Sequence, residues 1–156
     1  MDHTTYENDD IFDKIMQLPL LRVFNPFYKK YKEVLLYLFF GFSTFVITVI
    51  TFGLFDIYMG INELVANVLS WIIAVTFAFL TNRVWVFNSP TKGVKEYIRQ
   101  MASFYAGRLL TLAIEEGIIL IFVTWLAFDS MPVKIIAQIV VIVLNYIISK
   151  LVIFKK

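Results

Sequence analysis

NVLSWIIAVTFAFLTNRVWVF, residues 67–87, is the stretch of sequence that decides the fold. It is mainly apolar, with Asn67 at one end and Asn82-Arg83 near the other. An α-helix of this length rises about 30 Å, which is enough to cross the hydrocarbon core of a bilayer. The stretch therefore predicts a transmembrane helix that carries polar groups near both ends.

The composition of the whole chain also indicates a membrane protein. Hydrophobic residues make up 60% of its 156 residues, and they fall in runs. We expect an all-α, polytopic membrane protein with four spans, at about residues 34–55, 64–87, 102–128 and 133–154. Residues 34–156 would form the transmembrane domain, and residues 1–33 an N-terminal tail with an interfacial segment.

The scarcity of cysteine and histidine excludes several kinds of site. There is no cysteine, so disulfides and thiolate metal sites are excluded, and His3 is the single histidine. No extramembrane segment is long enough to build an active site for glycosyl transfer. We therefore expect no enzyme, no metal and no other cofactor. The net charge of only +2 gives no sign of a nucleic-acid partner.

The positive charges lie on one side of this topology. Among the fourteen Lys and Arg residues, only Lys134 falls on the opposite side. Because positively charged flanks stay in the cytoplasm, both termini and the connection between spans two and three should be cytoplasmic. We expect a multi-pass protein of the bacterial plasma membrane.

Two shorter segments are expected at the membrane surface. Asp9 and Asp10 can cap a short helix over residues 11–18, one side of which is apolar. A disordered tail is the alternative for this segment. Residues 91–101 form an amphipathic pattern that should lie along the interface and lead into the third span.

The ends of spans two and four resemble each other. FAFLTNRVWVF, residues 77–87, aligns without gaps with LNYIISKLVIF, residues 144–154. Each half of the chain is then a helical hairpin that ends in a cation, Arg83 or Lys150, one turn before an aromatic residue. This predicts two parallel repeats, as in some transporters. The alternative is that any cytoplasmic helix end collects a cation and an aromatic residue.

Three cations lie at similar depth near the cytoplasmic ends of spans two, three and four: Arg83, Arg108 and Lys150. Each one alone can extend its side chain to the headgroups. Together with Asn82 and Asn145 they can form a cationic pocket that suits the oxygens of a lipid phosphate. These five residues are the predicted binding site.

A second group of polar residues lies deeper in the spans. Glu115 and Glu116 are about midway along span three, where a charge costs about 3 kcal/mol to insert. We expect Glu115 to face the bundle and Glu116 to face a second subunit, in a homo-oligomer, or a wet crevice. Asn67 and Gln138 complete this intramembrane set, and a structural role in helix registry is the alternative.

The four spans, the glycine-containing FFGFSTFVI of the first span and above all FAFLTNRVWVF resemble the GtrA-like membrane proteins. The likeness is to the GtcA group in particular, which is linked to teichoic acid glycosylation, and it covers roughly residues 34–156. The family often has an aspartate seven residues after the first-span glycine. This chain has Thr48 there, so that role is absent or has moved to Glu115 or Glu116.

The resemblance implies a flippase for a polyprenyl-phosphate-linked sugar. Such a protein would move the sugar from the inner to the outer leaflet, where a separate membrane glycosyltransferase uses it to decorate a wall polymer or O-antigen. The cytoplasmic cations would hold the phosphate, while the prenyl tail would stay among the membrane lipids. Two alternatives stay open: a membrane scaffold for a glycosyltransferase, and a small proton-coupled multidrug exporter that depends on Glu115 or Glu116.

Overall fold

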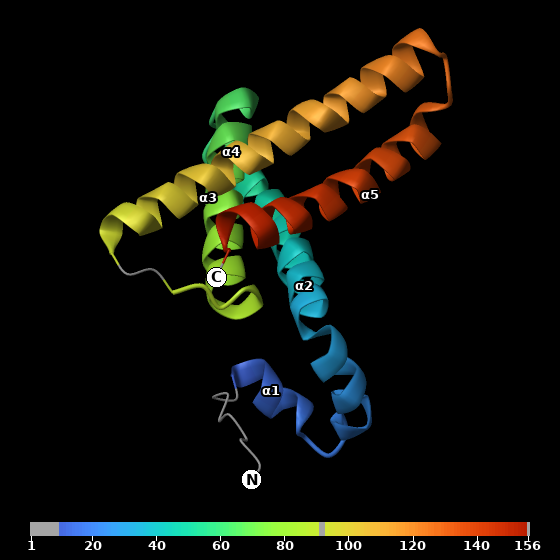
Figure 1. The fold of residues 1–156 in the computed structure, drawn as a ribbon. Helices are drawn as coiled ribbons and strands as arrows, with labels where there is room; N and C mark the ends of the chain where they lie inside the picture. Colours follow the sequence, from blue (N-terminus) through green and yellow to red (C-terminus); the bar gives the residue numbers. More distant parts are fainter. Residues whose placement is uncertain (1–9, 91–92, 156) are drawn as a thin grey trace.

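A computed structural model describes residues 10–90 and 93–155 of the chain, and within them it is helical, without strands. The helices are α1 (Ile11–Met16), α2 (Asn25–Gly53), α3 (Glu63–Thr81), α4 (Val94–Ile119) and α5 (Ser130–Ile148), shown in Figure 1. This confirms the all-α class. His3, the predicted cap Asp9 and residues 91–92 of the expected surface segment lie outside the described residues.

Each of the four long helices ends in a short π-helical segment. These segments are η2 (Leu54–Tyr58), η3 (Asn82–Val86), η4 (Leu120–Trp125) and η5 (Ser149–Ile153). After η3 and η5, the backbone N–H of Phe87 donates to Asn82 O and that of Phe154 donates to Ser149 O, both at 2.8 Å. π-Helical turns are rare and occur often at functional sites, so these two ends of the hairpins are of particular interest.

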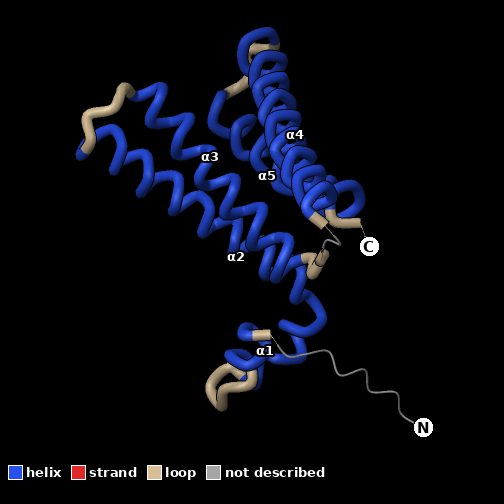
Figure 2. Tube along the Cα trace, turned by 90° about the vertical axis from the view of Figure 1, so that its left-hand side faces the viewer, coloured by secondary structure: helices blue, strands red, loops and turns tan. Residues whose placement is uncertain are grey.

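The long helices form two hairpins, α2–α3 and α4–α5, each with antiparallel helices (Figure 1). Figure 2 shows that the hairpins meet at the ends that carry η3 and η5 and separate toward their turns. The buried hydrophobic residues form a cluster at the same end. The two hairpins are therefore held together at one end.

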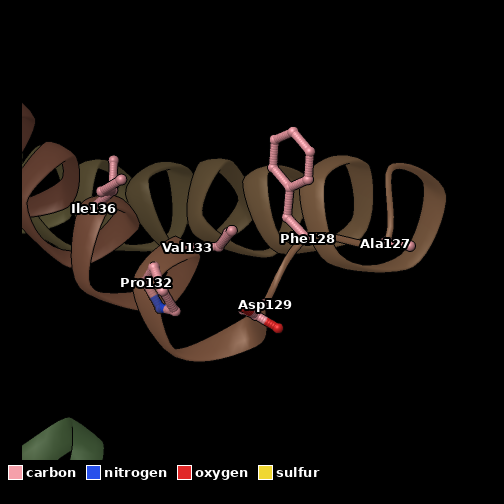
Figure 3. Close-up of a pocket in the computed structure, with 6 residues that line it drawn as sticks. All are labelled: Ala127, Phe128, Asp129, Pro132, Val133 and Ile136. Carbon is pink, nitrogen blue, oxygen red and sulfur yellow. The ribbon is translucent and has the colours of Figure 1, made fainter.

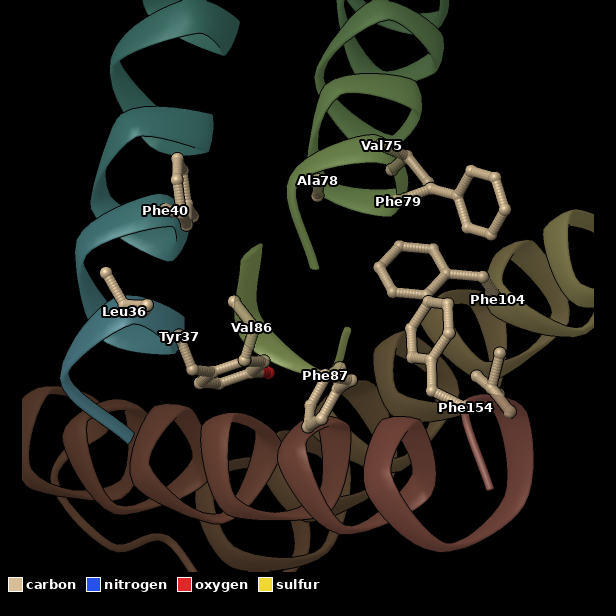
Figure 4. Packing of buried hydrophobic residues seen from close by; sticks show 11 residues of the cluster. Leu36, Tyr37, Phe40, Val75, Ala78, Phe79, Val86, Phe87, Phe104 and Phe154 are labelled. Atoms are coloured by element: carbon tan, nitrogen blue, oxygen red, sulfur yellow. The ribbon is translucent and has the colours of Figure 1, made fainter. Parts of the chain in front are cut away.

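Four phenylalanine rings form the centre of this junction (Figure 4). Phe87 stacks on Phe154 with 5.2 Å between ring centroids, and Phe154 also stacks on Phe79 at 5.9 Å. Phe104 of α4 packs against Phe79 at 5.7 Å and against Phe154 at 5.9 Å. Large aromatic side chains bury much apolar area, so this cluster is the main contact between the hairpins.

The short helix α1 is docked against the junction by specific contacts. Asp10 is its N-cap, as expected, because its Oδ1 accepts hydrogen bonds from the backbone N–H groups of Phe12 at 2.8 Å and Asp13 at 2.9 Å. Lys32 of α2 forms ion pairs with both aspartates, at 2.9 and 2.5 Å. The Phe12 ring packs edge-on against Phe40 at 5.5 Å. The helix ends at Met16, two residues earlier than expected.

Three helical segments are long and apolar enough to cross a membrane: Arg22–Tyr58, Glu63–Val86 and Ser130–Ile153. They contain the first, second and fourth expected spans. The helix of the first expected span, α2, begins at Asn25, well before residue 34. It is kinked at Tyr31, which has φ −117° and ψ 15°.

The third expected span, residues 102–128, lies in α4 and η4 but is not among these three segments. Arg108, Glu115 and Glu116 fall within it and lower its mean hydropathy. α4 begins at Val94, so the expected surface segment continues into this region as one unbroken helix. The division of the chain into domains at residue 33 stays a prediction.

The α3–η3 and α5–η5 segments correspond closely. Both contain 24 residues, counted from Glu63 to Val86 and from Ser130 to Ile153. Six buried positions of the first segment and its exit recur in the second, at the offset that aligns Phe87 with Phe154. They are Ala66, Ser70, Ala78, Asn82, Val86 and Phe87, matched by Val133, Ala137, Asn145, Ser149, Ile153 and Phe154.

Candidate anion-binding site at the hairpin junction

Glu33 of α2 joins the two hairpins through a polar contact that involves Lys150. The Lys150 ammonium is 2.8 Å from Glu33 Oε1, and the Tyr146 hydroxyl donates to the same oxygen at 2.5 Å. Lys150 Nζ also donates to the Tyr146 hydroxyl at 3.2 Å. The side chains of Lys150 and Glu33 are 46% and 35% exposed. Lys150, a predicted phosphate ligand, is therefore paired with a carboxylate at the surface of the junction.

Arg108 belongs to the same group of side chains. Its guanidinium carbon lies 4.8 Å from the ring centroid of Phe104, and the guanidinium interacts with the hydroxyl of Tyr37. Tyr37 is buried, and its ring packs edge-on against that of Tyr146 at 5.3 Å. Two tyrosine rings thus link Arg108 of α4 to Lys150 of η5. We call Glu33, Tyr37, Arg108, Tyr146 and Lys150 the junction cluster.

Arg83 lies over a different ring. Its guanidinium carbon is 5.0 Å from the ring centroid of Tyr97, which packs against Phe79 at 5.4 Å. Phe104, the ring beneath Arg108, is seven residues along α4 from Tyr97 and also contacts Phe79. The two arginines therefore lie at two places along one aromatic cluster. Of the three predicted cations, Arg108 and Lys150 are linked through Tyr37 and Tyr146, whereas Arg83 lies over Tyr97.

The two predicted asparagines are buried and hold helix contacts. Asn82 Nδ2 donates to Ala78 O at 2.7 Å, and its Oδ1 is buried without a hydrogen-bond partner among the described residues. Asn145 Oδ1 accepts a hydrogen bond from Thr111 Oγ1 at 3.0 Å, which joins α5 to α4. Asn82 presents an acceptor, and an acceptor does not suit a phosphate oxygen. The phosphate-binding role of these residues stays a prediction.

The deeper polar residues lie away from the junction cluster. Gln138 Nε2 donates to Glu115 Oε1, so this pair links the last turns of α4 to α5. Glu115 is half-buried, whereas Glu116 and Gln138 are exposed. Asn67 is exposed on α3. Glu115 thus faces its neighbouring helix and Glu116 faces the outside of the hairpin.

A hollow of about 430 Å³ occurs at the turn between α4 and α5, at the opposite end of this hairpin from the junction. It is lined mostly by apolar side chains (Figure 3). The lining residues are Ala127, Phe128, Asp129, Pro132, Val133 and Ile136. None of the predicted site residues lines this hollow.

The family model described as "GtrA/DPMS, transmembrane domain" matches residues 36–154, which include α3, α4, α5, most of α2 and all of the junction cluster except Glu33. The chain belongs to the GtrA/DPMS transmembrane-domain family. It is accordingly a membrane protein with a transmembrane domain, and the GtrA-like resemblance of the sequence is confirmed. Membership also agrees with the expectation that the chain is not itself an enzyme.

Relatives in this GtrA family include named bacterial proteins. The cell wall teichoic acid glycosylation protein GtcA of Listeria monocytogenes is 33% identical over 123 residues, which cover 79% of this chain and 85% of the relative. GtcA of Listeria innocua has the same identity and coverage. The uncharacterized membrane protein YwcD of Bacillus subtilis is 30% identical over 121 residues, with coverages of 78% and 95%.

The predicted phosphate site did not include three members of the junction cluster, Glu33, Tyr37 and Tyr146. Glu33 follows the basic and aromatic residues 28–32 and lies before the GtrA family match, which starts at residue 36. The available signal for Glu33 was its place in the sequence, as a single carboxylate directly after several cations and directly before the first predicted span. Nothing in the sequence indicated that Tyr37 and Tyr146 would meet, because they lie on different hairpins.

Proposed function

We propose that the chain crosses the membrane four times as two parallel hairpin repeats, with both termini in the cytoplasm. The equal lengths and matching buried positions of α3–η3 and α5–η5 support the repeat. α4 and η4 would supply the third span, in which Glu115 is hydrogen-bonded to Gln138 and Arg108 lies on an aromatic ring. Such pairing lowers the cost of polar groups in a bilayer.

The charges support the proposed orientation. Lys32, Arg83, Arg108 and Lys150 all lie at the junction end of the hairpins, whereas Lys134 lies near the turn between α4 and α5. Because cytoplasmic flanks carry the excess of Lys and Arg, the junction would be the cytoplasmic end. The exposed Glu116 would then face a second copy of the chain or water within the membrane.

We infer that the protein moves a polyprenyl-phosphate-linked sugar from the inner to the outer leaflet, for glycosylation of teichoic acid or another surface polysaccharide. The observation that carries this proposal is the grouping of Arg108, Tyr37, Tyr146 and Lys150 at the hairpin junction. Guanidinium, ammonium and phenol groups are all donors to phosphate oxygens. GtcA, a relative of similar length, is named for teichoic acid glycosylation.

The apolar surfaces of the hairpins fit a ligand with a long hydrocarbon tail. Large side chains such as Phe42, Phe45 and Ile50 on α2 are exposed, and in a bilayer they would contact lipid. A prenyl chain can lie in the same environment while its phosphate is held at the junction. The sugar would be passed to a membrane glycosyltransferase on the outer side.

Purified protein in liposomes tests this function directly. The assay measures the transbilayer movement of a fluorescent short-chain polyprenyl-phosphate sugar by external quenching. We expect faster movement with the wild type than in protein-free liposomes, and loss of that increase in Arg108→Ala. Lys134→Ala is the matched control. Lys134 is a cation near the turn between α4 and α5, away from the junction, so this variant should keep the activity.

A different result would favour the scaffold alternative. If the wild type restores wall glycosylation in cells but does not accelerate movement in liposomes, the protein acts by holding a glycosyltransferase and the transport proposal is wrong. If Arg108→Ala transports as well as the wild type, the phosphate does not bind at the junction cluster.

A further inference from the structure

We propose that the Glu33 carboxylate occupies the position of the ligand phosphate in the empty protein and must be displaced when the lipid phosphate binds. This inference rests on the proposed function, because it assigns a competitor to the same junction cluster. It gives Glu33 a role in selecting ligands, which neither the family match nor the cations themselves indicate.

The geometry around Glu33 is that of a bound oxyanion. One oxygen, Oε1, lies 2.8 Å from the Lys150 ammonium and accepts a hydrogen bond of 2.5 Å from the Tyr146 hydroxyl. Phosphate and carboxylate oxygens accept the same charge-assisted hydrogen bonds, so the two groups compete for the same donors. The donors belong to α5 and η5, whereas the carboxylate comes from the other hairpin.

The exposure of the pair makes displacement possible. Lys150 and Glu33 are 46% and 35% exposed, so a ligand in the headgroup region can reach them without unfolding the junction. Partly exposed ion pairs add little to stability. The contact is therefore weak enough to be exchanged, and its loss leaves the stacked Phe87 and Phe154 rings to hold the hairpins together.

A tethered competitor also acts as a filter. Glu33 is part of the chain and is therefore always present at a high effective concentration. A ligand binds only if its contacts with the cluster are stronger than those of the Glu33 carboxylate. A phosphate that also reaches Arg108, across the Tyr37 and Tyr146 rings, would make contacts that Glu33 does not make. Glu33 would thus exclude anions that can bind to Lys150 alone.

Removal of the Glu33 charge tests the inference. Binding of farnesyl phosphate, a short-chain prenyl phosphate, is measured by calorimetry on the full-length protein in detergent. Glu33→Gln keeps the shape and an acceptor for Tyr146 but loses the charge. We expect it to bind about two- to five-fold more tightly than the wild type, the factor that corresponds to loss of a partly exposed ion pair.

Three further variants make the result specific. Glu63→Gln, at the exposed start of α3 near the other end of its hairpin, is the matched control and should bind like the wild type. Lys150→Gln should weaken binding, and Glu33→Gln should have no further effect in that background, because Glu33 acts through Lys150. Glu33→Asp keeps the charge but is one methylene shorter, so it should also tighten binding.

The outcomes separate this inference from the proposed function. If the wild type binds farnesyl phosphate and Glu33→Gln binds equally or less tightly, the inference is overturned while the phosphate site stands. If neither protein binds, the proposed phosphate site itself is wrong. Equal affinity for inorganic phosphate would assign the cluster to free anions and contradict a lipid ligand.

Discussion

Phe87 and Phe154 stack on each other with 5.2 Å between ring centroids and 19° between ring planes. Each ring directly follows the π-helical end of its hairpin, η3 or η5. The two hairpins therefore meet through residues that occupy the same position in each. The junction cluster lies beside this stack, since the Phe87 ring is also 6.0 Å from that of Tyr146.

The aromatic stack should be the main source of stability between the hairpins. Phe154 is buried between Phe87, Phe79 and Phe104. Phe154→Ala should lower the free energy of unfolding by about 3–5 kcal/mol, the usual cost for a buried phenylalanine. Unfolding in a mixed micelle, followed by circular dichroism, measures this. Phe45→Ala, an exposed position on α2, is the control, and equal destabilisation by both would argue against a specific junction.

Arginine geometry should matter at position 108. The guanidinium lies over Phe104 and beside Tyr37, and the compact ammonium of a lysine cannot contact both in the same way. Arg108→Lys should therefore lose much of the transport in liposomes, about tenfold, which corresponds to one charged hydrogen bond. Lys150→Arg should be tolerated better, because Lys150 is half exposed. Full activity of Arg108→Lys would indicate that only charge is needed there.

The Glu115–Gln138 pair should act in helix pairing. Glu115→Gln keeps a hydrogen bond to Gln138 and removes a charge, so we expect unchanged transport and equal or greater stability. Gln138→Leu leaves the carboxylate without this donor and should destabilise the α4–α5 hairpin by about 1–3 kcal/mol. Thermal unfolding and the liposome assay measure the two effects. If Glu115→Gln instead loses transport and also lowers the resistance of cells to cationic drugs, the result would favour a proton-coupled exporter.

The docking of α1 should depend on pH. Burial raises the pKa of Asp10, but hydrogen bonds from Lys32 and from backbone N–H groups outweigh burial and leave the pKa below its usual value of 3.8. A lowered pKa stabilises the docked form above the usual value, and this contribution is lost as the pH falls through the lowered one. We expect the docking of α1 to weaken progressively as the pH falls below 3.8.

Trp85 reports on that transition because Phe12 of α1 packs against it at 6.4 Å. In a variant with Trp71 and Trp125 replaced by phenylalanine, Trp85 fluorescence should change between pH 7 and about pH 3. Lys32→Gln removes both ion pairs with Asp10 and Asp13, so it should show the acid form already at pH 7. A Lys32→Gln variant with the wild-type pH profile would contradict this account of docking.

Much of the fold could be predicted from local sequence. Apolar runs of sufficient length predict membrane helices, Asp10 provides a recognisable N-cap, and the similarity of residues 77–87 and 144–154 anticipates the two matching hairpin ends. The boundaries were less accurate at Asn25 and Val94, where the helices begin well before the predicted spans at residues 34 and 102. The apolar runs mark the spans but not the starts of these helices, because charged residues such as Lys, Glu and Arg are also good helix formers and extend the helix beyond the apolar run.

The sequence by itself determined which regions are helical and which family the chain belongs to, and it predicted a similar depth for Arg83, Arg108 and Lys150. Only the tertiary structure decided that Lys150 and Tyr146 would both contact Glu33, although Glu33 and Tyr146 are 113 residues apart in the sequence. It also decided that Arg83 would lie over Tyr97. Helical periodicity fixes the depth and the face of a side chain on its own helix. It does not fix which side chain of another helix lies opposite, because that depends on how the two hairpins pack around the phenylalanine rings.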